Sequence, residues 1–213
     1  MIGRRGVFAS GAALALMSGT GFAPPPEIRF EVMRNGSRIG HQSVTFQQRE
    51  TVLQADTTAE IIVRFGPIVL FRYNHSVRET WRDGQFESLD STTNDNGKPF
   101  RVHAERGPDG VTVEASTIPR DVRPPETIPL THWNILCMER PLFNPQDGAR
   151  IESRVIPHGE EMVALANGAM VRATHYSLAG KVTLDDWYDE AKLWTALHSV
   201  GTDGSKIEYR RVV

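Results

Sequence analysis

Tight-turn dipeptides constrain the fold of this 213-residue chain more than any other feature of its sequence. Asn-Gly and Asp-Gly tolerate the positive φ angles of two-residue hairpin turns, so each pair predicts a reversal between antiparallel strands. Seven such pairs are spread along the chain: Asn35-Gly36, Asp83-Gly84, Asn96-Gly97, Asp109-Gly110, Asp147-Gly148, Asn167-Gly168 and Asp203-Gly204. This spacing predicts one hairpin after another.

The residues between these turns alternate as half-buried strands do. From Leu53 to Phe65, and again from Val69 to Trp81, every second residue is mainly apolar, and Gly66-Pro67 separates the two runs. Both runs exceed the usual strand of about five or six residues, and long hairpin-joined strands tend to coil. We therefore predict an all-β fold, a long-stranded antiparallel meander curled into a barrel or half-barrel. Further strands are expected at Ile28–Arg34, Phe100–Glu105, Val111–Ala115, Arg150–Ile156, Met170–Leu178, Val182–Tyr188, Leu193–His198 and Lys206–Val212.

Two segments depart from the strand pattern. Thr117–Pro129 is rich in proline and is expected to be a loop. Thr131–Met138 predicts one short helix, with a buried strand as the alternative. It contains Cys137, which is the sole cysteine, so a disulfide within the chain is impossible. We expect this thiol to be buried as a small hydrophobic group.

The N-terminal residues have the layout of an export signal. Arg4 and Arg5 precede an uncharged stretch of apolar and small residues, Val7–Ala23. The arginine pair fits the general secretory route and the twin-arginine route equally well. We predict a signal peptide at residues 1–23, a proline-rich spacer at 24–27 and a single β domain at 28–213, located in the periplasm. An uncleaved signal would hold this domain close to the membrane.

Charge and motif content exclude several functional classes. The net charge is −2, and basic and acidic residues are interspersed, so no nucleic-acid partner is expected. The chain has no HExxH helix motif, no Walker A loop and no G-x-S-x-G elbow, so we predict no metal and no cofactor. The oxygen-rich run Asp90–Gly97 lacks the EF-hand pattern, and it is more simply read as a turn cap than as a calcium site.

His75 and Glu79 are polar residues on an otherwise apolar strand face, beside Tyr73 and Trp81. Buried polar groups need partners. The pair is therefore either a satisfied polar patch near the strand end, which we favour, or a ligand-contacting or acid–base pair inside a cavity.

A binding or carrier protein is the function that the pattern favours. A stripe on one strand face would line the concave side of a bent sheet and hold a small apolar or lipid-like molecule. It consists of Val69, Phe71, Tyr73, Val77 and Trp81. Tryptophans at 133, 187 and 194 would close its mouth, and Asn134 would need a polar partner there. The ligand-contacting residues expected are Phe71, Tyr73, His75, Glu79, Trp81, Trp133, Asn134 and Trp187.

Two alternatives remain open. An envelope hydrolase would use His75, Glu79, His103 and Asn134 as acid–base or orienting groups, provided that they converge. A structural envelope protein would have a packed interior without a cavity and would contact its partner through Thr117–Pro129. No residue is assigned as catalytic from the sequence.

Three stretches resemble an uncharacterised family of exported proteobacterial proteins, which is described only as a domain of unknown function. They are Phe30–Gly40, Glu79–Gly97 and Asp186–Tyr209. The family's glycine turn after Trp-Tyr-Asp is replaced here by Glu190-Ala191-Lys192, which implies a looser hairpin. The resemblance implies an exported all-β protein and carries over no functional residue. More distantly, the predicted meander is similar to curved-sheet periplasmic proteins such as the lipoprotein carriers.

Overall fold

Successive hairpins build one large sheet, as the turn pairs predict. The computed structural model describes residues 25–213, so the predicted signal peptide at 1–23 lies outside the described residues. The strands up to the middle of the chain are β1 (Glu27–Arg34), β2 (Ser37–Arg49), β3 (Val52–Phe65), β4 (Ile68–Arg82), β5 (Gln85–Asp95), β6 (Lys98–Gly107), β7 (Gly110–Ala115) and β8 (Asp121–Arg123). The later strands of this sheet are β12 (Ser153–Ala164), β13 (Met170–Gly180), β14 (Leu184–Asp189), β15 (Trp194–Val200) and β16 (Lys206–Val212).

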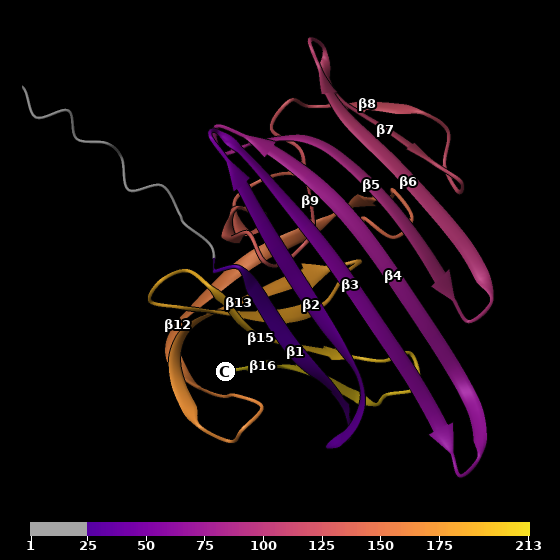
Figure 1. Cartoon of the computed structure of the whole chain (residues 1–213), viewed down its shortest axis with the longest axis vertical. Helices are drawn as coiled ribbons and strands as arrows, with labels where there is room; N and C mark the ends of the chain where they lie inside the picture. Colours follow the sequence, from indigo (N-terminus) through magenta and orange to yellow (C-terminus); the bar gives the residue numbers. More distant parts are fainter. Residues whose placement is uncertain (1–24) are drawn as a thin grey trace, which may run out of the picture.

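The thirteen strands follow the order β12-β13-β14-β15-β16-β1-β2-β3-β4-β5-β6-β7-β8. All neighbours are adjacent in sequence except β1 and β16, which pair antiparallel and join the two halves. Figure 1 shows the sheet curled so that β2–β6 form one wall and the β12–β16 half lies behind it. β8 and β12 remain free edges of the sheet, so it is barrel-like but not closed. The predicted all-β, antiparallel, curled meander is confirmed.

The turn residues adopt the backbone that their chemistry predicts. Six of the seven Asn-Gly and Asp-Gly pairs lie in connections between consecutive strands, and Asp109-Gly110 runs from such a connection into the first residue of β7. At Asn35-Gly36, Asp83-Gly84 and Asn96-Gly97 both residues have positive φ, as a tight hairpin turn requires. The register of the long meander is therefore set locally by these pairs.

A second, three-stranded sheet covers part of the concave side. It consists of β9 (Ile128–Pro129), β10 (Leu142–Phe143) and β11 (Arg150–Ile151) in the order β11-β10-β9. Leu130, Trp133 and Phe143 from this region join the main hydrophobic core. The core thus fills the space between the curled sheet and the segment that crosses it.

The structure corrects several boundaries. Thr117–Pro129 is not a plain loop, because it contains β8 and β9 and buries Arg123 at 2% exposure. Thr131–Met138 contains a short 3-10 helix, η1 (Ile135–Met138). Among the described residues, no helix is long and apolar enough to cross a membrane. In the run Asp90–Gly97, Asp90–Asp95 belong to β5 and only Asn96-Gly97 turns. The predicted turn cap is present at the end of the run, where the Gly97 amide donates to the Asn94 side-chain oxygen at 2.8 Å.

Arg150–Ile156 is also corrected, because it is divided between β11 and β12. Cys137 is buried, as predicted, with its sulfur 3.3 Å from the Tyr188 hydroxyl. Between β14 and β15 the chain turns through Glu190-Ala191-Lys192, where Lys192 has a φ of +61° and its amide donates to the Asp189 carbonyl oxygen at 2.8 Å.

Candidate functional site

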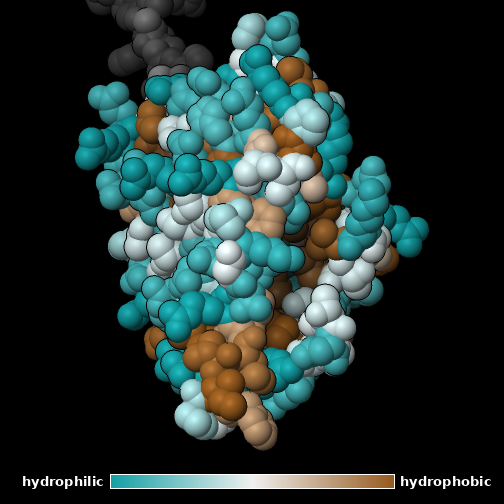
Figure 2. Space-filling view, turned by 90° about the vertical axis from the view of Figure 1, so that its right-hand side faces the viewer, coloured by the Kyte–Doolittle hydropathy of each residue, from teal (hydrophilic) through white to brown (hydrophobic). Residues whose placement is uncertain are grey.

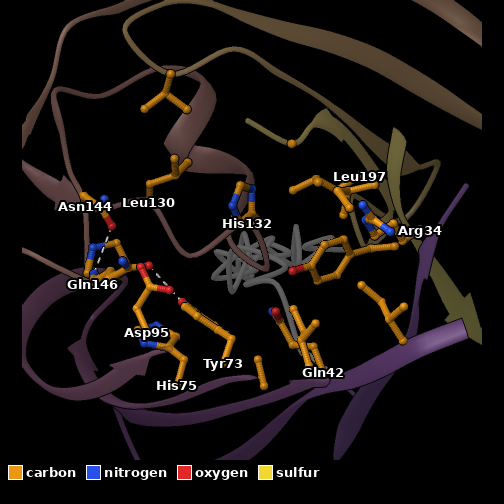
Figure 3. Close-up of a pocket in the computed structure, with 18 of the residues that line it drawn as sticks. Arg34, Gln42, Tyr73, His75, Asp95, Leu130, His132, Asn144, Gln146 and Leu197 are labelled. Atoms are coloured by element: carbon orange, nitrogen blue, oxygen red, sulfur yellow. Dashed lines mark hydrogen bonds between the residues drawn. The ribbon is translucent and has the colours of Figure 1, made fainter. Parts of the chain in front are cut away.

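A cavity of about 770 Å³ lies on the concave side of the sheet. Its floor is formed by β2, β3 and β4, and the segments 130–132 and 144–146 together with β15 and β16 complete its wall. Figure 3 shows side chains from both the sheet and the crossing segments pointing into this space. A volume of this size is typical of small-molecule sites, which span about 300–1,000 Å³.

Strand pairing arranges the floor in rows across β2, β3 and β4. Gln42, Ala59 and His75 stand side by side in one row, and small Ala59 leaves space between the two polar side chains. In the next row, towards the packed core, Thr57 stands beside Val77. The Thr57 hydroxyl is fully buried and has no hydrogen-bond partner among the described residues. This end of the floor is therefore polar.

Towards the β3–β4 turn the floor becomes apolar. Ile61, Val63, Leu70 and Phe71 line this part of the cavity. The opposite wall contributes further apolar side chains from the second sheet and from the β15–β16 half, namely Ile151, Val182, Leu197 and Ile207. The sheet floor thus changes from hydrogen-bonding groups to hydrocarbon along the strand direction, and the Arg34–Asp203 ion pair lies at the rim beside Ile207.

The titratable groups of the sheet floor are neutral at neutral pH. His75 Nδ1 lies 2.7 Å from Thr93 Oγ1, and burial lowers the pKa of His75 from 6.5 to about 4. The Tyr73 hydroxyl donates to Gln146 Oε1 at 3.0 Å, and burial raises the pKa of Tyr73 above its ordinary value. Burial likewise raises the pKa of Tyr209, which lines the opposite wall, to about 12. These groups offer hydrogen bonds rather than charges.

His132 enters the cavity from residues 130–138, the segment after β9 that crosses the concave side of the sheet. Its backbone has a φ of +59°, which is unusual for a residue other than glycine. Its Nδ1 lies 2.8 Å from Oδ2 of the fully buried Asp186, and Asp186 Oδ1 accepts a hydrogen bond from Trp194 Nε1 at 2.9 Å. The imidazole also stacks on Trp194 with ring centroids 5.2 Å apart. Asp186 therefore fixes the ring orientation, as buried carboxylates do for histidines in many sites.

A second buried carboxylate closes the deep end of the cavity. Glu79 is 0% exposed and accepts indole hydrogen bonds from Trp81 at 2.9 Å and from Trp133 at 3.0 Å. Burial raises the pKa of Glu79 to about 7, although the indole donors and the Thr131 hydroxyl act in the opposite direction. The two tryptophans and Phe46 pack edge to face around it. We call this cluster of Glu79, Trp81, Trp133 and Phe46 the plug. Its hydrogen bonds connect the crossing segment to β4.

The sequence-predicted residues separate into three groups. Phe71, Tyr73 and His75 line the cavity, and so does Trp194. The predicted contacts Glu79, Trp81 and Trp133 are buried in the plug instead, packed against one another. Asn134 caps η1, because its side-chain oxygen accepts from the Leu136 amide at 3.1 Å.

Two of the predicted residues lie away from the cavity. Trp187 does not close its mouth, because it belongs to a separate cluster with Val163, Ala173 and Ala196 and donates to Glu161 Oε1 at 2.7 Å. Alternation along β14 places it on the face opposite to Asp186. His103 is exposed on β6 and contacts Asp90 at 2.8 Å, so the predicted acid–base set does not converge.

Sequence reasoning missed Gln42, Thr57, His132 and Gln146 as cavity residues. Thr57 was detectable, because it shares the alternating face of residues 53–65. His132 was passed over as a neighbour of Cys137, and its partner Asp186 is far away in the sequence. Among residues 25–213, no group of three or more His, Cys, Asp or Glu side chains is placed to hold a metal ion.

Comparison with known proteins places this fold in context. No curated protein matches the chain. The crystal structure of a beta-barrel-like protein of domain of unknown function DUF1849 from Brucella abortus is similar, with a TM-score of 0.59 and 8% sequence identity over 87% of this chain and 95% of that chain. At this identity the similarity shows the fold alone. The model of a domain of unknown function, DUF6134, matches residues 30–212. The chain therefore belongs to the DUF6134 family.

Proposed function

We propose that this protein binds an amphipathic small molecule in the concave cavity, with the apolar part towards the β3–β4 turn and a polar head near Gln42 and His75. The observation that carries the proposal is a cavity of about 770 Å³ whose sheet floor changes from polar Gln42 and His75 to apolar Ile61, Val63 and Phe71. Small-molecule sites are typically mostly apolar clefts of this size with a few placed polar groups. The polar head of a ligand would meet the side chains of Gln42 and His75.

The charges around the cavity favour a neutral head group. At the rim, the Arg34 guanidinium is held by Asp203 at 2.5 Å, so it is already neutralised. Asp95 is half-buried opposite Tyr73 and adds a negative charge, which disfavours an anionic ligand. His75 is neutral because burial lowers its pKa. An ester, amide or hydroxyl head with an acyl chain or another apolar body fits these walls.

We also propose that binding takes place outside the cytoplasm, in the periplasm. The support is the sequence of residues 1–23, with Arg4 and Arg5 before an uncharged apolar segment. A carrier for lipid-like molecules has an evident use between membranes. The structural-protein alternative predicted an interior without a cavity, so the cavity favours the carrier hypothesis over it.

The test uses a variant that fills the cavity. Ala59 faces the space between Gln42 and His75, so Ala59→Phe would occupy the polar part of the site. The matched control, Ala191→Phe, makes the same change at an exposed turn. We expect native mass spectrometry of protein purified from periplasm to show a bound lipid-like mass in the wild type and in the control. The Ala59→Phe protein, checked for folding by circular dichroism, should be free of it. A ligand-free wild type, or equal loading of all three proteins, would contradict the proposal.

Hydrolysis of an ester is a second candidate function, favoured by the His132–Asp186 pair. A histidine oriented by a buried carboxylate at a cavity wall has the arrangement of a general base, which would take a proton from water attacking the ester carbonyl. The test is His132→Gln. If the site is hydrolytic, this variant should retain an intact ester that the wild type converts to acid and alcohol. Intact ester on both proteins would leave binding as the sole function.

A further inference from the structure

The β3–β4 hairpin extends past its neighbours in the sheet. Pairing between β2 and β3 ends at Ile61, and pairing between β4 and β5 ends at Tyr73. Beyond these residues β3 and β4 pair with each other as far as the Gly66-Pro67 turn. Four residues of β3 lie beyond Ile61, so at about 3.3 Å per residue this overhang is roughly 13 Å long. Figure 1 shows the hairpin tip as the lowest point of the sheet.

The overhang is covered with apolar side chains that face solvent. The described residues include nine exposed large hydrophobic side chains, and four of them are here: Phe65 at 75%, Ile68 at 59%, Val69 at 38% and Leu70 at 57% exposure. They form the brown patch at the bottom of Figure 2. Clustered exposed apolar groups in a soluble domain mark an interaction site, whereas single ones need no explanation.

The charged side chains of the hairpin itself are of one sign. Residues 61–73 contain two charged side chains, Arg64 and Arg72, and both are exposed. Exposed Lys98, the first residue of β6, lies beside the β5–β6 turn and is paired across the strands with half-buried Asp95. The Asn96 amide of this turn donates to the Arg72 carbonyl oxygen at 2.8 Å. An apolar tip flanked by cations complements a surface that has hydrocarbon below a layer of negative charge.

The patch is continuous with the rim of the cavity. Leu70 belongs to the exposed patch and also lines the cavity, and its half-buried neighbour Phe71 lines the cavity as well. A surface seated on the hairpin would therefore lie beside the apolar end of the cavity. This end is the one through which an acyl chain would enter.

We propose that the β3–β4 hairpin tip docks this protein on an anionic lipid bilayer. Phe65, Ile68, Val69 and Leu70 enter the interface between head groups and acyl chains, and Arg64 and Arg72 contact lipid phosphates. Docking goes beyond the proposed ligand binding and does not require it. Where both occur, the cavity opens directly onto the lipid.

A bilayer fits the patch better than a second copy of the chain does. Two hairpin tips packed against each other would bring two Arg64–Arg72 sets together, and like charges in contact disfavour association. A stable protein interface also buries about 800 Å² on each partner, which is more than four side chains at a hairpin tip supply.

The experiment places a fluorescent label on the hairpin, so that vesicle binding through the N-terminal segment is not mistaken for docking of the hairpin. Ile68→Cys in the full chain is labelled with an environment-sensitive fluorophore, and buried Cys137, at 1% exposure, is protected from the reagent. The matched control is Met162→Cys on β12, which has a similar exposure of 53%. Vesicles contain phosphatidylcholine alone or phosphatidylcholine with phosphatidylglycerol. With the anionic vesicles, we expect the label at 68 to shift to shorter wavelength and to be quenched by nitroxide-labelled acyl chains, while the label at 162 does neither.

A charge variant completes the test. In Arg64→Gln/Arg72→Gln, the concentration of anionic vesicles that gives half the spectral change should rise about tenfold or more, since each cation near such a surface contributes about 1 kcal/mol. The exposed arginines in the control Arg101→Gln/Arg154→Gln should have little effect. An unshifted label at 68, or equal quenching at 68 and 162, would overturn the proposal. A shift that appears without vesicles and grows with protein concentration would also overturn it, because it would assign the tip to self-association.

Discussion

His75 and Glu79 lie four residues apart on β4, and their titrations have opposite effects on stability. Burial raises the pKa of Glu79 from 4.5 to about 7, so its contribution to folding is full below pH 4.5 and is lost as the pH rises through 7. Burial lowers the pKa of His75 from 6.5 to about 4, so its contribution is full above pH 6.5 and is lost as the pH falls through 4. Between pH 4.5 and 6.5 the two slopes should cancel.

The magnitude follows from the two pKa shifts. Each pKa unit corresponds to about 1.4 kcal/mol, so each group contributes up to about 3 kcal/mol across its window. In Glu79→Gln, the histidine slope remains, and the free energy of unfolding should rise by about 3 kcal/mol from pH 4 to 6.5. In His75→Gln, the carboxyl slope remains, and the free energy should fall by about 3 kcal/mol from pH 4.5 to 7.

Urea unfolding followed by tryptophan fluorescence measures these slopes, since Trp81 and Trp133 surround Glu79. Glu79→Gln should also carry a cost of about 1–3 kcal/mol that does not depend on pH, because its amide group leaves one indole donor without an acceptor. This cost lowers the free energy of unfolding by the same amount at every pH, so it does not change the slope. The double variant serves as the control and should follow the wild-type slope. Parallel profiles for the wild type and both single variants would refute the reasoning.

Three further predictions address other parts of the molecule. Thr57→Val should leave the free energy of unfolding, measured in urea, unchanged or raise it by up to about 1 kcal/mol, because no hydrogen bond is lost. Gly40→Ala should lower the midpoint of urea unfolding by an equivalent of about 2 kcal/mol or more, since its Cβ would lie 2.1 Å from the Glu60 carbonyl oxygen. Gly36→Ala, which meets only open space at a φ of +80°, should cost about 1 kcal/mol. Cys137 should react with a maleimide only in denaturant, because burial raises its thiol pKa; fast labelling of the native protein would contradict this.

Local chemistry explains why so much of the sheet could be predicted. The pairs such as Asn35-Gly36 carry their own φ preference, and alternation within residues 53–65 identifies the buried face without knowledge of the partner strand. The same pattern was not recognised in Asp90–Asp95. Its inward residues there are Ser91 and Thr93, so the alternating burial has no hydrophobic signature.

The candidate site was only partly predictable, because it is assembled across the fold. Phe71, Tyr73 and His75 follow from the face of a single strand. His132 becomes a cavity residue through Asp186, which comes from the other half of the sheet, and no local pattern links the two. Trp133 shows the converse error: an aromatic residue expected at the cavity mouth instead donates to a buried carboxylate.

Pairing between β1 and β16 has a consequence for how the chain folds. Each half of the sheet is a meander of neighbouring hairpins, which form from contacts close in sequence and on fast timescales. The junction of the halves is different, because Arg29 pairs with Val212 at the far end of the chain. The sheet is therefore completed only after the last strand has left the ribosome. We expect two preformed half-sheets that dock late, with the joining of the first and last strands as the slow step.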